Sequence, residues 1–182
     1  MTRTLIIGGA RSGKSAHAEA LASASGKPVV YIATAQAGDA EMQLRIAHHR
    51  ARRDGQWQTV EETLALGAVI QKYSNADNLL LIDCLTVWLS NLLFAEQTEF
   101  PEIGVITPPA CFIEQRAALL QALAQAPGEV ILVSNEVGQG IVPQGAISRW
   151  FVDEAGRLNQ AVAAGCERAV LVVAGLPLTL KG

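Results

Sequence analysis

Short, continuous apolar runs alternate along the chain with longer segments whose apolar residues recur at helical spacing. The runs are rich in leucine or β-branched residues and bounded by turn residues, which is typical of strands buried on both faces of a sheet. They cover residues 4–7, 29–33, 78–82, 130–134 and 169–173. The segments between them predict helices over 15–23, 40–53, 64–73, 85–95, 111–126 and 148–164, and 57–60 predicts a short edge strand.

This alternation implies a mostly parallel sheet covered by helices, joined by right-handed crossovers. Ligands of such sheets bind beyond the carboxyl ends of the strands, so the chemistry is expected there. One stretch, residues 97–110, holds three prolines and a glycine and is expected to be a loop. No repeat or linker divides the chain, so we expect a single domain over residues 1–182.

Charge and cysteine usage narrow the functional class. The 182 residues include 14 Lys+Arg and 17 Asp+Glu, a net charge of −3, which disfavours a general nucleic-acid coat. The three cysteines are scattered without a CxxC pair, which suits a reducing cytosol. The most hydrophobic segment, residues 79–95, contains an aspartate and other polar residues, whereas a membrane span needs about 20 mostly apolar residues. We therefore expect a soluble, cytoplasmic protein without an export signal.

Residues 8–15 fit the phosphate-binding pattern G-x-x-x-x-G-K-[ST] between a predicted strand and a predicted helix. Glycines let the backbone curl so that its N–H groups face phosphate oxygens, and the following helix adds the positive end of its dipole. Lys14 supplies positive charge to the outer phosphates, and the Ser15 hydroxyl can bind Mg²⁺. The alternative is a glycine-rich turn that binds nothing. The predicted cradle comprises Gly8, Gly9, Ala10, Arg11, Ser12, Gly13, Lys14 and Ser15.

A phosphate-binding site of this kind usually needs an acidic residue that helps to bind magnesium. Asp83 follows the apolar run 78–82, as expected of the carboxylate that helps to hold Mg²⁺, directly or through water. The alternative is an aspartate that only caps the next helix. With the cradle, the pattern predicts an α/β fold of the P-loop NTPase class, RecA-like, with three αβα layers.

The predicted helix 40–53 concentrates basic chemistry. Four of the fourteen basic residues and two of the three histidines lie within nine positions, and Arg45, His48 and Arg52 share one helical face. An imidazole among guanidinium groups can attack phosphorus while the arginines hold the developing charge. The alternative is a solvated basic face, and periodicity alone favours it. His17, on the predicted helix after the cradle, is expected to be packed or solvated.

Several segments together resemble one family. They are GGARSGKS at 8–15, YIATAQ at 31–36, the EMxxRIxHHR run ending at Arg50, WQTVE at 57–61, SNEVGQGIVP at 134–143, AGRLNQ at 155–160 and VVAGLPLTLK at 172–181. The chain is thus similar, over nearly its whole length, to the bifunctional adenosylcobinamide kinases/adenosylcobinamide-phosphate guanylyltransferases of cobalamin biosynthesis. The histidine and NEVGxGIVP segments are far more specific than the cradle.

The resemblance implies two reactions with ATP and GTP as substrates and Mg²⁺ as cofactor. A nucleoside triphosphate phosphorylates the aminopropanol hydroxyl of adenosylcobinamide, and GMP from GTP is then joined to that phosphate through a GMP–histidine intermediate. By motif position the histidine is His48, which with Lys14 is the implied catalytic pair. The resemblance also implies that the protein forms a homotrimer. It implies further nucleotide contacts at Ile32, Ala33, Thr34, His49, Arg50, Ala51, Arg52, Glu61 and Asp83.

The sequence departs from the family pattern at two places, and two other functions compete with the one that the resemblance implies. Asp83 stands where related chains can carry the longer Glu, and residues 97–110 match no pattern that would identify corrinoid contacts. A regulatory GTPase should carry an NKxD-type segment, which the chain lacks. A monofunctional small-molecule kinase, with His48 acting only electrostatically, would differ in forming no covalent nucleotide.

Overall fold

The strands form one sheet in which the strand carrying the cradle lies near the middle. The computed structural model describes residues 2–35, 55, 57–96 and 99–182. Within these residues the sheet has seven strands in the order β3-β2-β4-β5-β1-β6-β7. They are β1 (Arg3–Gly8), β2 (Val29–Ala33), β3 (Gln58–Glu61), β4 (Leu79–Asp83), β5 (Glu129–Asn135), β6 (Arg168–Val173) and β7 (Leu176–Lys181). Only the β6–β7 pair is antiparallel; all other pairs are parallel.

The described helices lie within one or two residues of the sequence-based expectations. They are α1 (Lys14–Ala24), α3 (Leu66–Tyr73), α4 (Leu85–Leu93), α5 (Ala110–Gln125) and α6 (Ala146–Gly165). The predicted helix 40–53 lies outside the described residues. Residues 99–109 contain no helix or strand, as their prolines predicted. No helix in the described part of the chain is long and apolar enough to cross a membrane.

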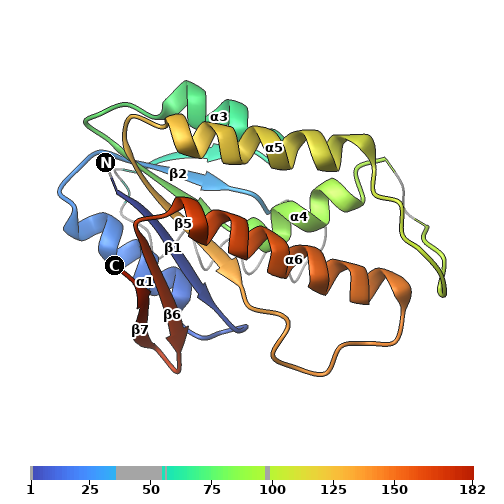
Figure 1. Ribbon diagram of the computed structural model, residues 1–182. Coiled ribbons are helices and arrows are strands. Elements are labelled where there is room, and N and C mark those ends of the chain that lie inside the picture. The colour runs from blue at the N-terminus through green and yellow to red at the C-terminus, as the bar shows by residue number, and fades with distance from the viewer. Residues whose placement is uncertain (1, 36–54, 56, 97–98) are drawn as a thin grey trace.

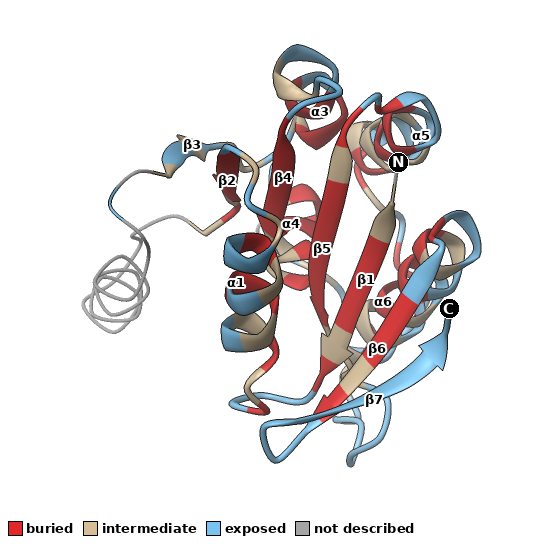
Figure 2. Ribbon diagram, turned by 90° about the vertical axis from the view of Figure 1, so that its left-hand side faces the viewer, coloured by how far each residue is buried: buried red, intermediate tan, exposed pale blue. Residues whose placement is uncertain are grey.

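The sheet separates two apolar layers (Figures 1 and 2). On one face, Ala18 and Ala22 of α1 pack against alternate residues of the strands, such as Ile6 and Val133. On the other face, α3, α4, α5 and α6 cover the intervening residues, including Leu5 and Leu132. Strand residues alternate between the faces, so both apolar faces are buried and the strands read as continuous hydrophobic runs. The three-layer α/β prediction is confirmed.

The terminal strand β7 is a feature that the hydrophobic pattern did not predict. It follows β6 through a two-residue turn in which Ala174 and Gly175 both have positive φ, 53° and 79°. Such a turn matches the twist of an antiparallel hairpin. Every residue of β7 is exposed, including Leu176, which is 72% exposed. This strand forms the outer edge of the sheet beside β6 (Figure 2).

Candidate nucleotide-binding site

The predicted cradle forms a closed loop between β1 and α1. Inside it the N–H of Ser12 donates to the Gly9 carbonyl at 3.2 Å, and the Ser12 carbonyl accepts from the N–H of Gly175 at 2.8 Å. Gly13, at the N-terminus of α1, has a φ of 96°, which only glycine adopts without strain. A Cβ on Gly13 would lie 3.1 Å from the Cα of Gly175. The β6–β7 turn therefore supports the cradle from outside.

Lys14 places a positive charge at the base of this loop. The residue is only 9% exposed, and its Nζ donates to the Gly9 carbonyl across the loop at 3.0 Å. Burial lowers the pKa of the Lys14 ammonium, and the nearby Asp83 carboxylate opposes that shift. The ammonium thus lies within electrostatic reach of the end of β4, although the sequence separates them by about seventy positions.

Three of the predicted nucleotide contacts end adjacent strands in a single row. Strand register aligns Ala33 of β2 with Glu61 of β3 on one side and with Asp83 of β4 on the other. Asp83 belongs to the α1 face, because Leu79 and Leu81, at alternate positions of the same strand, pack there. The hydroxyl of Tyr31 donates to Asp83 Oδ2 at 3.1 Å and holds the carboxylate on this face.

Thr34 fastens the end of β2 to the start of α4. Its hydroxyl donates to the Cys84 carbonyl and accepts from the Cys84 N–H, each at 2.8 Å. The Thr34 carbonyl accepts from the side-chain amide of Asn91 on α4, also at 2.8 Å. Thr34 and Ile32 are both 0% exposed. A contribution of these two residues to nucleotide binding would therefore come from the strand end that they hold in place.

The two acidic residues after β3 have different surroundings. Glu62 accepts from the N–H groups of Leu64 and Ala65, each at 2.8 Å, just before α3. Its side chain is therefore engaged in closing the connection to that helix. Glu61, in contrast, is exposed at the end of β3, in the row that contains Asp83. Of the pair, Glu61 is the one that lies in this row.

The oxygen groups near the cradle fit a magnesium ion. Ser15 lies in the first turn of α1, and Asp83 lies close enough to the same turn to act on Lys14. A hydroxyl and a carboxylate are hard oxygen donors, which Mg²⁺ prefers, and Mg²⁺ completes its shell with waters and phosphate oxygens. Among the described residues there is no cluster of three His, Cys, Asp or Glu that would bind a transition metal.

The remaining predicted residues divide into two groups. Gly9, Ala10 and Arg11 are exposed at the top of the cradle, and Arg11 has a φ of 56°. The second group lies outside the described residues, so its predicted roles stay predictions; it comprises His48, His49, Arg50, Ala51 and Arg52.

The site also contains residues that the sequence reasoning did not single out. Cys84 follows Asp83, and burial together with the charge of Asp83 raises the pKa of its thiol to about 11, so it stays protonated. Gly175 reaches the cradle from the far end of the chain. The available signal for Cys84 was its place next to Asp83, but nothing local indicates Gly175, whose contact depends on β6 lying beside β1.

The backbone of the cradle provides a test with a matched pair of glycines. Gly13→Ala should lower the free energy of unfolding by about 1–2 kcal/mol, because a Cβ is strained at positive φ and approaches Gly175. Gly9→Ala should change it by less than about 0.5 kcal/mol, because a Cβ there meets no atom within 4 Å. Urea denaturation of both variants measures the difference. Equal losses would contradict the described loop.

The chain is similar to known proteins in sequence and in fold. The chain is 54% identical over 180 residues to the bifunctional adenosylcobalamin biosynthesis protein CobP of Pseudomonas aeruginosa, covering 99% of this chain and 98% of that one. It is 41% identical over 179 residues to the corresponding protein CobU of Escherichia coli, covering 97% and 98%. Among solved structures, the ATPase EscN of enteropathogenic E. coli matches with a TM-score of 0.54 at 13% identity, covering 95% of this chain and 43% of that one.

The likeness to EscN concerns the fold alone, which is that of a P-loop NTPase. The family assignment comes from the sequence comparisons. The model of the family described as cobinamide kinase / cobinamide phosphate guanyltransferase matches residues 4–180, nearly the entire chain. The protein therefore belongs to the cobinamide kinase / cobinamide phosphate guanyltransferase family.

Proposed function

We propose that residues 1–182, as one domain, carry out two successive reactions on a corrinoid. The first phosphorylates the aminopropanol hydroxyl of adenosylcobinamide with ATP or GTP, and the second transfers GMP from GTP to the new phosphate. The observation that supports this most is the buried Lys14 ammonium inside the cradle and within reach of Asp83, in a chain of this family. A buried positive charge inside such a cradle is suited to bind the phosphates of a nucleotide.

In the first reaction the acceptor hydroxyl oxygen attacks the γ-phosphorus of the triphosphate. The bond from that phosphorus to the β–γ bridging oxygen breaks, the nucleoside diphosphate leaves and the hydroxyl proton passes to solvent. Lys14 exchanges its bond to the Gly9 carbonyl for phosphate oxygens and balances the charge that develops on them. The N–H groups of the cradle hold the remaining phosphates in line for the transfer.

In the second reaction the neutral imidazole of His48 attacks the α-phosphorus of GTP, and pyrophosphate leaves. A phosphate oxygen of adenosylcobinamide phosphate then attacks the phosphorus of the GMP–histidine bond. That bond breaks, His48 is regenerated and adenosylcobinamide-GDP is released. Covalent capture replaces one transfer between two anions by two separate displacements. His49, Arg50, Ala51 and Arg52, with Glu61 and the strand ends at 32–34 and 83, are proposed to surround the guanine nucleotide.

Mg²⁺ is the proposed metal, held by the Ser15 hydroxyl and the Asp83 carboxylate. When bound, it neutralises charge on the phosphate oxygens in both reactions. Tyr31 supports this role by orienting the Asp83 carboxylate through its hydroxyl. We further place the enzyme in the cytoplasm, where its three free cysteines, Cys84, Cys111 and Cys166, would remain reduced.

The covalent intermediate gives the sharpest test of the second reaction. Incubation of the protein with GTP and Mg²⁺, followed by denaturation and intact-mass measurement, should reveal a GMP adduct that is labile in acid and stable in base. His48→Ala should abolish the adduct because it removes the attacking nitrogen. His17→Ala is the matched control and should retain it, since His17 lies on α1 outside the residues proposed for guanylyl transfer. Active protein that binds GTP but forms no adduct would favour a simple kinase.

We also propose that the protein assembles as a homotrimer. Exposed leucines along β7, which are Leu176, Leu178 and Leu180, support an interface at this sheet edge, because they are more than half exposed in one chain. Analytical ultracentrifugation should give three times the mass of one chain. A monomer at micromolar concentration would contradict the proposal.

A further inference from the structure

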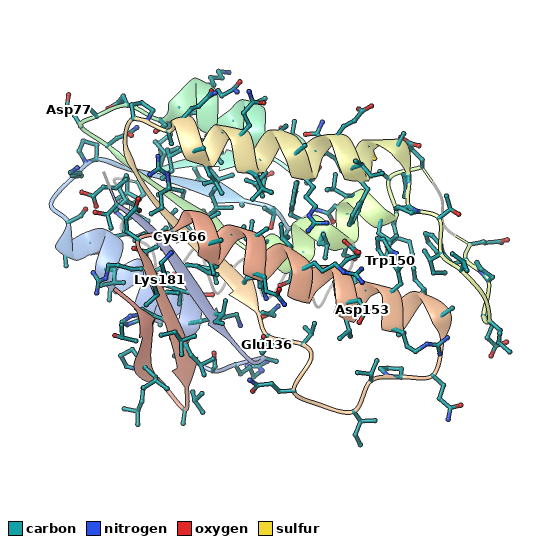
Figure 3. The ribbon with its side chains drawn as sticks, in the orientation of Figure 1. Asp77, Glu136, Trp150, Asp153, Cys166 and Lys181 are labelled. Carbon is teal, nitrogen blue, oxygen red and sulfur yellow. The ribbon has the colours of Figure 1, made fainter. Side chains whose placement is uncertain are left out.

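Asn135 ends the strand that lies between the cradle and the carboxylate. In the sheet, β5 is flanked by β1, which leads into the cradle, and by β4, which ends at Asp83. Register aligns Asn135 with Gly8, the first residue of the cradle, and aligns Val133 with Asp83. Figure 3 places the next residue, Glu136, at this carboxyl end of β5 and Asp77 at the opposite end of the sheet.

The side chain of Asn135 belongs to the same face of the sheet as the cradle. Ile131 and Val133, at alternate positions of β5, pack with α1, whereas Val130 and Leu132 pack on the other face. The alternation of a strand puts Asn135 with the first pair. The cradle folds over this face at the neighbouring position, since a Cβ on Gly8 would lie 2.5 Å from the Ser12 hydroxyl oxygen.

The backbone of Asn135 is held on both sides. Its N–H donates to the Thr86 hydroxyl at 2.7 Å, and its carbonyl accepts from the Asn159 side-chain amide at 3.2 Å. Thr86 and Asn159, which reach it from α4 and α6, are only 9% and 8% exposed. The N–H of Glu136 donates to the Gly8 carbonyl at 3.0 Å. Hydrogen bonds to three elements, α4, α6 and β1, thus fix the position of Asn135, as a preorganised site requires.

The side-chain amide of Asn135, unlike its backbone, takes no part in these hydrogen bonds. Within residues 2–35, 55, 57–96 and 99–182 it makes no hydrogen bond, and the residue is half-buried at the edge where ligands of parallel sheets bind. An asparagine amide offers two donors and one acceptor and carries no charge. A rigid backbone that presents an unused donor beside a phosphate cradle is suited to recognise a phosphate oxygen.

We propose that Nδ2 of Asn135 donates a hydrogen bond to an oxygen of the terminal phosphoryl group of the bound nucleoside triphosphate. This inference rests on the proposed function, because it needs the triphosphate in the cradle. Asn135 distinguishes a triphosphate from a diphosphate and holds the transferred group between Lys14 and Asp83. Thr86 and Asn159 are positioning residues that act through the Asn135 backbone.

The test compares GTP with GDP in variants of Asn135. Calorimetric titrations with Mg²⁺ use the full chain with His48→Ala, so that GTP is not consumed by guanylyl transfer. Asn135→Ala should weaken GTP binding by about 10-fold or more and leave GDP binding within about twofold, because a hydrogen bond to a charged partner is lost. Asn135→Asp, nearly identical in shape, should weaken GTP binding further because its carboxylate repels the phosphate. In protein that retains His48, the kcat/KM for cobinamide phosphorylation should fall by about 10- to 100-fold.

Asn75→Ala is the matched control. Asn75 is exposed in the turn before β4, at the end of the sheet opposite the cradle, and its replacement should change neither affinity. Equal losses of GTP and GDP binding in Asn135→Ala, or no loss of either, would overturn the inference. Wild-type protein that binds GTP yet phosphorylates no cobinamide would refute the proposed function instead, while the GTP/GDP ratio would still decide the role of Asn135.

Discussion

The site depends on an ammonium group that is kept largely out of water. Lys14 is buried at the first turn of α1, where desolvation disfavours its charge and lowers its pKa. Its bond to the Gly9 carbonyl and the nearby Asp83 carboxylate keep this charge tolerable. A phosphate is a stronger hydrogen-bond partner than a carbonyl. The buried Lys14 ammonium therefore favours a bound phosphate over its present bond to Gly9. The tight turn at Gly13 and the contact of Gly175 with Ser12 support this arrangement.

The order of the strands brings other polar groups to the edge of the sheet where Lys14 lies. Because β5 lies between β1 and β4, the cradle and Asp83 flank a strand that itself ends in a polar residue, Asn135. Beyond β4, register adds Ala33 and Glu61 to the same edge. The α1 face of the sheet therefore presents the cradle, the proposed magnesium ligand Asp83 and further polar groups together, each at the end of a different strand. This is the edge at which parallel α/β sheets bind ligands.

The sequence predicted the features that depend on local pattern. It did not predict contacts between residues that are far apart along the chain. Buried parallel strands read as apolar runs, and the cradle and Asp83 follow two of them, so the fold class and these residues were accessible. Strand β7 was not, because a proline, Pro177, argues against a strand and because the strand is exposed along its length. The contacts of Asn135 with Thr86 and Asn159 were also hidden, since they join residues 49 and 24 positions apart. Side-chain periodicity carries no information about which strands become neighbours.

The central claim is that the cradle and the end of β4 form one phosphate-binding site. A double-mutant cycle on Mg²⁺-dependent GTP binding, with Lys14→Met, Asp83→Asn and the double variant, tests it most directly. If both residues act on the same magnesium–triphosphate group, the double variant should lose less affinity than the sum of the single losses, with a coupling of about 1 kcal/mol or more. Losses that add within about 0.3–0.5 kcal/mol would show that Lys14 and Asp83 act independently and would contradict the account.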